Sequence, residues 1–172
     1  YPLERLMEIG ARLGADVPFC MVGGCRRATG VGTQLEDVAS ALELNLVVVK
    51  PCAGLLTREV FGALRLDAAT RHPDTPGAVR AAQAGDLGAL VECMGNVLEP
   101  VAMARRPEIA VAIGDVLAQG AQGARMSGSG PTVFGLFDSW EKAVEAAVAL
   151  KRKYAECCAA RNVAAGLKFM EE

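Results

Sequence analysis

The sequence predicts an α+β fold in which antiparallel hairpins form a sheet and helices cover one face of it. Three observations carry this prediction. Residues 44–50, LNLVVVK, form an apolar, β-branched run that Pro51 ends, as is typical of a buried strand. Residues 124–127 and 132–137 are two further strand patterns, joined by a glycine-rich turn. Between these strands, apolar residues recur at helical spacing.

The N-terminal part is predicted to hold a helix and a hairpin. Apolar residues at helical spacing predict a first helix that ends at Gly14. A short buried strand is predicted over residues 17–22, and Gly23-Gly24 then turns the chain into a second strand over residues 25–29. Gly30-Val31-Gly32 is interpreted as a turn, and residues 39–42 as helical.

The rest of the chain is predicted to be mainly helical, with a second pair of strands. Thr57 is predicted to cap a helix over residues 57–65, and the polar residues 67–76 are the one plausible linker. Helices are predicted over residues 77–84, over 86–97 with Asp86 as the N-cap, and over 107–119. After the two strands, Ser139 caps a long helix to about residue 158, and residues 164–170 form a closing strand.

Length and composition exclude several classes of protein. A chain of 172 residues is enough for one compact unit. Its net charge of −2 supplies no basic surface for nucleic acid or an anionic membrane, and no apolar run approaches the roughly 18 residues of a membrane span. Because the six cysteines lack C-x-x-C spacing and His72 is the only histidine, we expect reduced thiols in the cytoplasm, no metal ligands and no histidine-dependent catalysis.

A glycine-rich segment between two strands is the first candidate site. The segment consists of Ser127, Gly128, Ser129, Gly130 and Pro131. Its glycines allow backbone conformations that point consecutive N–H groups at one spot, and such a nest suits phosphate oxygens. It is neither a Walker A loop nor a Rossmann fingerprint, since no Lys-Ser/Thr follows and Val133 stands at the third glycine position. On spacing alone, an anion site and a plain tight turn both remain open.

Two further side chains are candidates, each with a structural alternative. Asp16 lies between a helix end and an apolar segment, where its carboxylate can orient or deprotonate an attacking hydroxyl. The alternative is an Asx-type turn residue that leads into Val17 and Pro18. Phe61 has a spacing that is typical of a core residue, with Val60 on the same side of the predicted helix.

A series of motifs runs along nearly the whole chain. The series is LGADVPFC at 13–20, ATGVG at 28–32, VKP at 49–51, LTREVF at 56–61, HPD at 72–74, GDL at 85–87, NVLE at 96–99 and MSGSGPTVFGLF at 126–137. In this order the motifs resemble those of the 4-diphosphocytidyl-2-C-methyl-D-erythritol kinases, a family of the GHMP kinase superfamily. Other GHMP kinases share the glycine-rich loop but lack the rest of the series, which makes them poorer matches.

This resemblance implies an enzyme that uses ATP and Mg²⁺ to phosphorylate the 2-hydroxyl of 4-diphosphocytidyl-2-C-methyl-D-erythritol, on the methylerythritol phosphate route to isoprenoids. It implies that Asp16 is the catalytic aspartate, that Thr57 binds the substrate and that Phe61 stacks on its cytosine. The loop that faces the phosphates is then Ser127, Gly128, Ser129 and Gly130. Phosphoryl transfer depends on positioning and charge stabilisation, which suits one carboxylate and an amide-lined loop.

By the same resemblance, residues 1–66 are the remainder of a GHMP kinase N-terminal domain and residues 67–172 are the C-terminal domain. The family's lysine partner to the aspartate, a second cytosine-stacking aromatic and the ATP-binding loop have no counterpart, so we expect no kinase activity from this chain alone. We expect self-association through strand edges that the truncation exposes. Two alternatives remain open: a non-catalytic module that binds an anionic metabolite, and a GHMP kinase for another small alcohol.

Overall fold

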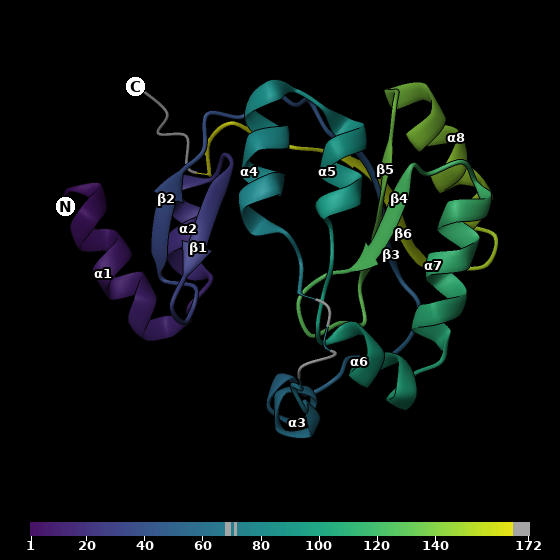
Figure 1. Ribbon diagram of the computed structural model, residues 1–172, viewed down its shortest axis with the longest axis horizontal. Coiled ribbons are helices and arrows are strands. Elements are labelled where there is room, and N and C mark those ends of the chain that lie inside the picture. The colour runs from purple at the N-terminus through teal and green to yellow at the C-terminus, as the bar shows by residue number, and fades with distance from the viewer. Residues whose placement is uncertain (68–69, 71, 167–172) are drawn as a thin grey trace.

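The computed structural model describes residues 1–67, 70 and 72–166, and it shows an α+β fold with two antiparallel sheets (Figure 1). The larger sheet has the strand order β4–β5–β3–β6, and β1 and β2 form a separate sheet. The helices are α1 (Leu3–Leu13), α2 (Val17–Val22), α3 (Thr57–Ala63), α4 (Thr75–Ala84), α5 (Leu87–Cys93), α6 (Glu99–Arg105), α7 (Glu108–Ala118) and α8 (Trp140–Leu150). The strands are β1 (Arg26–Thr29), β2 (Gln34–Asp37), β3 (Asn45–Lys50), β4 (Gly123–Met126), β5 (Val133–Phe137) and β6 (Glu156–Arg161).

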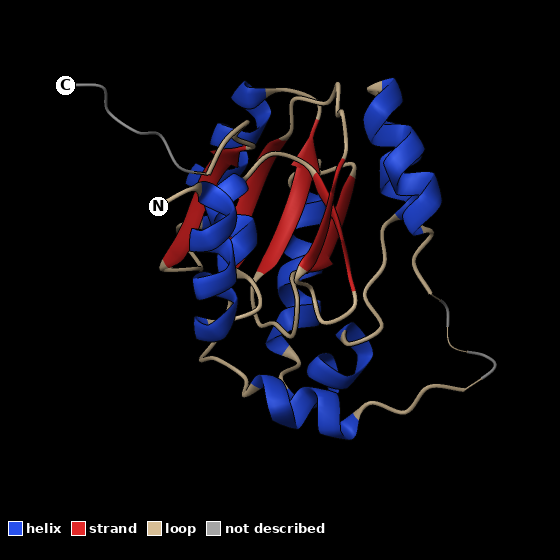
Figure 2. Ribbon diagram, turned by 90° about the vertical axis from the view of Figure 1, so that its left-hand side faces the viewer, coloured by secondary structure: helices blue, strands red, loops and turns tan. Residues whose placement is uncertain are grey.

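Helices lie on both sides of the larger sheet. As predicted, helices cover one face of the sheet: α7 and α8 contact β3, β4, β5 and β6. Figure 1 shows α4 and α5 on the opposite side. Figure 2 views the molecule from the side of α1, with the strands side by side in the middle. The larger sheet combines β3, from residues 1–66, with β4, β5 and β6, from residues 67–172. The division of the chain into domains at residues 66 and 67 stays a prediction.

The main core lies between this sheet and the helices α7 and α8. Val47, Val49 and Val133 of the strands are fully buried and belong to one cluster with apolar residues of both helices. A glycine lets α7 approach the sheet closely. A Cβ atom on Gly135 of β5 would lie only 2.2 Å from Cγ1 of Val116, so a larger residue would push the helix away.

The prediction of a strand over residues 17–22 is wrong, because these residues form the helix α2. A six-residue apolar run cannot be assigned to a strand or a helix from periodicity alone. Local signals decide in favour of the helix. Pro18 occupies its first turn, where a missing N–H costs nothing, and Gly23, with a φ of 62°, ends it.

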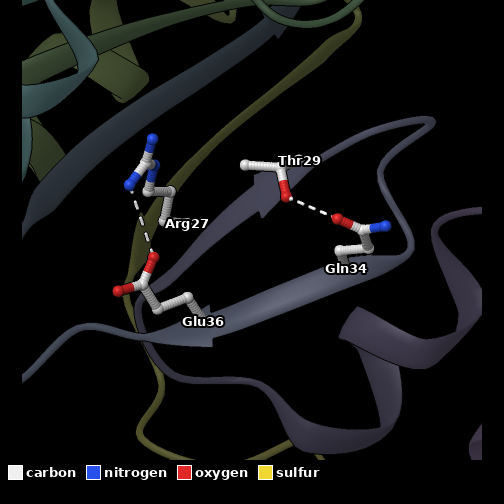
Figure 3. Close-up of polar contacts among 4 residues, drawn as sticks. All are labelled: Arg27, Thr29, Gln34 and Glu36. Atoms are coloured by element: carbon white, nitrogen blue, oxygen red, sulfur yellow. Dashed lines mark hydrogen bonds and ion pairs between the residues drawn. The ribbon is translucent and has the colours of Figure 1, made fainter.

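The first hairpin therefore pairs different segments from those expected. β1 confirms the strand predicted over residues 25–29, but its partner is β2, and the predicted turn at Gly30-Val31-Gly32 joins the two strands. Figure 3 shows two of the cross-strand pairs. Nη1 of Arg27 lies 3.4 Å from Oε2 of Glu36, and the Thr29 hydroxyl donates to Oε1 of Gln34 over 3.2 Å. Self-association through exposed strand edges stays a prediction. Because residues 17–22 are helical, the strand that it still concerns is β1 of this hairpin.

Further predictions need correction elsewhere in the chain. The long helix that Ser139 caps ends at Leu150, and residues 156–161 form the strand β6. Residues 39–42 are irregular, residues 99–105 form the unexpected helix α6, and residues 164–166 are not a strand. The rest of the closing strand expected over 164–170 lies outside the described residues. β6 pairs with β3, where Nζ of Lys50 lies 2.9 Å from Oε1 of Glu156.

A polar cluster fixes α7 to the turn that follows α8. The Tyr154 hydroxyl and Nζ of Lys153 both donate to Oδ2 of Asp115, the lysine over 2.5 Å. These two hydrogen bonds hold the pKa of Asp115 below its usual range. Burial, and then the contact with the Asp115 carboxylate, raise the pKa of Tyr154. The cluster therefore ties a buried tyrosine to a helix that packs on the sheet.

Replacing Tyr154 by phenylalanine is expected to lower the free energy of unfolding by about 1–2 kcal/mol at neutral pH, since a hydrogen bond is lost. The raised pKa means that the folded state holds the phenolic proton more tightly. Its contribution is complete below about pH 10 and declines as the pH rises above that value. Urea unfolding is measured at neutral pH and above about pH 10, and the difference in unfolding free energy between wild type and Tyr154→Phe should be smaller at the higher pH. Tyr1→Phe, at a 96% exposed position, should leave the unfolding free energy unchanged at both pH values. The same difference in unfolding free energy at both pH values would contradict the hydrogen bond from Tyr154 to Asp115 as its source.

Within the part of the chain that the structure describes, no helix is both long enough and apolar enough to cross a membrane.

Candidate functional site

The glycine-rich segment is an ordered loop between β4 and β5. The Ser127 N–H donates to the carbonyl of Thr132 over 2.8 Å, and the Gly130 N–H donates back to the carbonyl of Ser127 over 3.0 Å. Gly128 and Gly130 have φ values of 55° and 81°, which glycine adopts at little cost. A Cβ atom on Gly130 would also lie 2.5 Å from Sδ of Met126. The loop thus depends on glycine for both its conformation and its packing.

Two N–H groups of this loop are available to a ligand. No hydrogen bond to any described residue occupies the backbone N–H of Gly128 or of Ser129. Consecutive N–H groups of this kind bind anionic oxygens. A cavity of about 440 Å³ lies on the Asn96 side of the loop, where Asn96, Ser127 and Gly128 line it and Ser129 does not. These two N–H groups leave the loop able to bind an anion, and the anion site stays a prediction.

The segment NVLE, residues 96–99, forms hydrogen bonds with the backbone at the start of the glycine-rich loop. Nδ2 of Asn96 donates to the carbonyls of Met126 and Gly128 over 2.9 and 2.8 Å. Oε2 of Glu99 accepts from the N–H of Met126 over 2.8 Å. Neither residue was among the expected site residues, and the one signal in the sequence was the motif itself. Sequence spacing cannot show that residue 96 lies beside residue 128.

Thr57 lies at the loop, but it does not cap its helix. Leu56 is the N-cap of α3, and no side chain caps that end, so the prediction of a Thr57 cap is wrong by one position. The Thr57 hydroxyl instead lies 2.9 Å from the Ser129 hydroxyl, and either one can donate the hydrogen bond. The contact joins residues that are 72 positions apart. Val60 of α3 is fully buried and packs into the core. Nη1 of Arg105 on α6 lies 3.4 Å from Oε2 of Glu59 on α3.

Phe61 does not belong to the core. Its side chain is 57% exposed, whereas its neighbour Val60 is fully buried, so the two residues do not share a side of α3 as expected. Phe61 instead follows Thr57 by one helical turn, and residues four apart lie on the same face of a helix. An exposed aromatic ring therefore stands on the helical face whose Thr57 contacts the glycine loop.

Asp16 is the one expected site residue that the structure does not connect to this group. It is the N-cap of α2, is exposed, and its side chain makes no capping hydrogen bond. Among the described residues, no hydrogen bond or ion pair reaches its carboxylate. In Figure 1, α2 lies behind the first hairpin, whereas α3 lies below the sheet. The carboxylate is open to solvent and to a ligand.

The described residues do not assemble a metal centre of their own. No three side chains of His, Cys, Asp or Glu within this part of the chain are grouped so that they could hold an ion. The two N–H groups and the hydroxyl of Ser129 suit phosphate oxygens, and the described residues provide no ligand set for Mg²⁺.

Comparison with known proteins places this geometry in a family. Residues 78–156 match the family model described as GHMP kinases C terminal, which confirms the expected fold. The 4-diphosphocytidyl-2-C-methyl-D-erythritol kinase of Lachnoclostridium phytofermentans is 43% identical over 145 residues, which cover 84% of this chain and 50% of that protein. That of Acetivibrio thermocellus is 38% identical over 92% of this chain and 56% of its own length.

The chain belongs to the 4-diphosphocytidyl-2-C-methyl-D-erythritol kinase family of the GHMP kinases. A crystal structure named 4-(cytidine 5'-diphospho)-2C-methyl-D-erythritol kinase agrees with this, with a TM-score of 0.77 and 31% identity over 91% of this chain and 56% of that one. Homoserine kinase from Cytophaga hutchinsonii, with a TM-score of 0.72 and 19% identity, shows the shared GHMP kinase fold alone. The chain spans about half the length of the family members it matches.

Proposed function

We propose that these 172 residues are the C-terminal part of a cytoplasmic kinase that transfers the γ-phosphoryl group of ATP to the 2-hydroxyl of 4-diphosphocytidyl-2-C-methyl-D-erythritol. The product lies on the methylerythritol phosphate route to isoprenoids. The observation that carries the proposal is the contact between Thr57 and Ser129. It joins a loop suited to phosphates to a helix with an exposed aromatic ring, in a chain 43% identical to a kinase named for this substrate.

Each element of the site has a role in this proposal. The N–H groups of Gly128 and Ser129 bind phosphate oxygens, where fixed donors stabilise charge that develops during transfer. Phe61 stacks on the cytosine, and Thr57 binds the substrate beside it. Asp16 activates or orients the accepting hydroxyl. ATP supplies the phosphoryl group, and Mg²⁺ stays an expectation tied to its phosphates.

The activity is tested with the protein made from the complete reading frame that encodes this chain. ADP release is measured with ATP and 4-diphosphocytidyl-2-C-methyl-D-erythritol, and in parallel with homoserine and mevalonate as alternative alcohols. Turnover of the cytidylated alcohol alone is expected. Faster turnover of homoserine or mevalonate would replace the substrate assignment, and no turnover of any alcohol would overturn the kinase proposal.

The variant Phe61→Ala tests the cytidine site in the same protein. The loss of a stacked ring is expected to weaken binding of cytidine diphosphate by roughly 1–3 kcal/mol, as measured by titration calorimetry. Because the ring is 57% exposed, the free energy of unfolding should change by less than about 0.5 kcal/mol. Leu66→Ala, at a 56% exposed position three residues after the end of α3, is the matched control and should leave the affinity unchanged. Equal affinities of Phe61→Ala and wild type would remove Phe61 from the site.

A further inference from the structure

The proposed function leaves the segment NVLE, residues 96–99, without a role, although the segment touches the glycine loop. It connects α5 to α6, and Leu98, which is 6% exposed, anchors it in the core. Asn96 is half-buried and lines the cavity beside the loop.

The hydrogen bonds of Asn96 fix which way its amide points. Oδ1 accepts from the backbone N–H of Leu98 over 2.9 Å, so the NH₂ group faces the other way. There it meets the carbonyls of Met126 and Gly128 over 2.9 and 2.8 Å. An amide is the one neutral side-chain group that offers two donors and an acceptor at once. All three are used here.

The contact with the Gly128 carbonyl has a direct effect on the ligand side of the loop. That carbonyl and the N–H of Ser129 belong to the same peptide unit, and in a planar trans peptide they point in opposite directions. Asn96 holds the carbonyl on its own side, so the Ser129 N–H points away from Asn96. A peptide flip would present a carbonyl oxygen to an approaching phosphate instead, and the two would repel each other.

The base of the loop is fixed in the same way. The Met126 carbonyl accepts from Asn96 and the Met126 N–H donates to Glu99, so both polar groups of this residue are held by one segment. Its side chain is buried against the position of Gly130. With Met126 immobile and the Gly128 carbonyl held, the peptide between Gly128 and Ser129 has a single favoured orientation.

We propose that Asn96 is a positioning residue for phosphoryl transfer, which sets the direction of the Ser129 N–H without touching the substrate itself. The proposal rests on the proposed function of the loop. Removing one preorganised donor from such a site lowers kcat by about 100- to 1,000-fold in other enzymes. The cytidine-binding side, Thr57 and Phe61, stays intact.

The test compares Asn96→Ala with Asn162→Ala in the protein made from the complete reading frame. Asn162 is a matched control because its amide clamps another segment: Oδ1 accepts from the Leu44 N–H over 2.8 Å and Nδ2 donates to the Leu42 carbonyl over 3.2 Å. For Asn96→Ala we expect kcat to fall by about 100-fold, with the KM for the cytidylated substrate changed by less than about threefold. The control should keep its kcat at a similar loss of melting temperature. An equal kcat in both variants would overturn the proposal.

A second variant guards against misfolding. Asn96→Asp keeps an acceptor for the Leu98 N–H but places a carboxylate oxygen against two carbonyls, so it should be as slow as Asn96→Ala at neutral pH. Its rate relative to wild type should recover as the pH is lowered towards the pKa of a carboxyl group, because protonation restores a donor. A flat relative rate would contradict the positioning role.

A readout without turnover separates this proposal from the proposed function. Titration with ATP, followed by NMR of the backbone amides, should shift the Gly128 and Ser129 resonances in wild type and in Asn162→Ala, and much less in Asn96→Ala. A wild type that shows these shifts but phosphorylates no alcohol would contradict the proposed function alone. Equal shifts in Asn96→Ala would contradict the role of Asn96 alone.

Discussion

Replacing Asp16 by asparagine is expected to lower the kcat of the kinase by about 100- to 10,000-fold, the range that a positioned acid or base contributes. Asparagine keeps the size of the side chain but cannot accept the proton of the attacking hydroxyl. No described residue bonds to the carboxylate, which is exposed at the start of α2, so the free energy of unfolding should change by less than about 0.5 kcal/mol.

Steady-state rates of ADP release measure this effect, with Glu145→Gln as the control. Glu145 is an exposed carboxylate on α8, on the side of the sheet away from α5, and its loss should leave kcat unchanged. A kcat within threefold of wild type would remove Asp16 from the chemistry.

Replacing Phe137 by alanine is expected to lower the free energy of unfolding by about 3–5 kcal/mol, which is the cost of removing a fully buried aromatic ring from a packed core. Phe137 is 1% exposed at the end of β5 and belongs to the main core cluster. A loss of this size is a large fraction of the stability of a small domain.

Urea unfolding followed by circular dichroism measures this loss, and Phe61→Ala is the matched comparison. Both variants remove the same ring, one from the core and one from the surface. Phe137→Leu, which leaves a smaller gap, should lose less and secures the measurement if the alanine variant does not fold. Equal losses for the two alanine variants would contradict the burial of Phe137.

Sequence reasoning succeeded where a local signal decides the structure. The β-branched run of β3 forms a central strand, and Asp86 and Ser139 cap their helices through side chains that accept from the backbone three residues later. It failed where distant residues decide. β6 reads ECCAAR, which has no strand pattern, and it is extended because it pairs with β3 along its whole length.

The same division holds for the candidate site. The glycine loop was predictable because two glycines and two flanking strands leave few conformations for it. The role of Asn96 was not, because it depends on two carbonyls about 30 positions away in the sequence. Nor was the exposure of Phe61, since neighbouring positions on a short helix can face either the core or the solvent.

The central place of β3 governs the order in which the protein can form during synthesis. Its partner β6 lies 106 residues further along at the pair of Lys50 and Glu156. Until the ribosome has released residues 156–161, one edge of β3 has no strand to bond to, and an open edge invites pairing with other chains. Among the described strands, β3 therefore has no partner until β5 emerges and only one partner until β6 emerges.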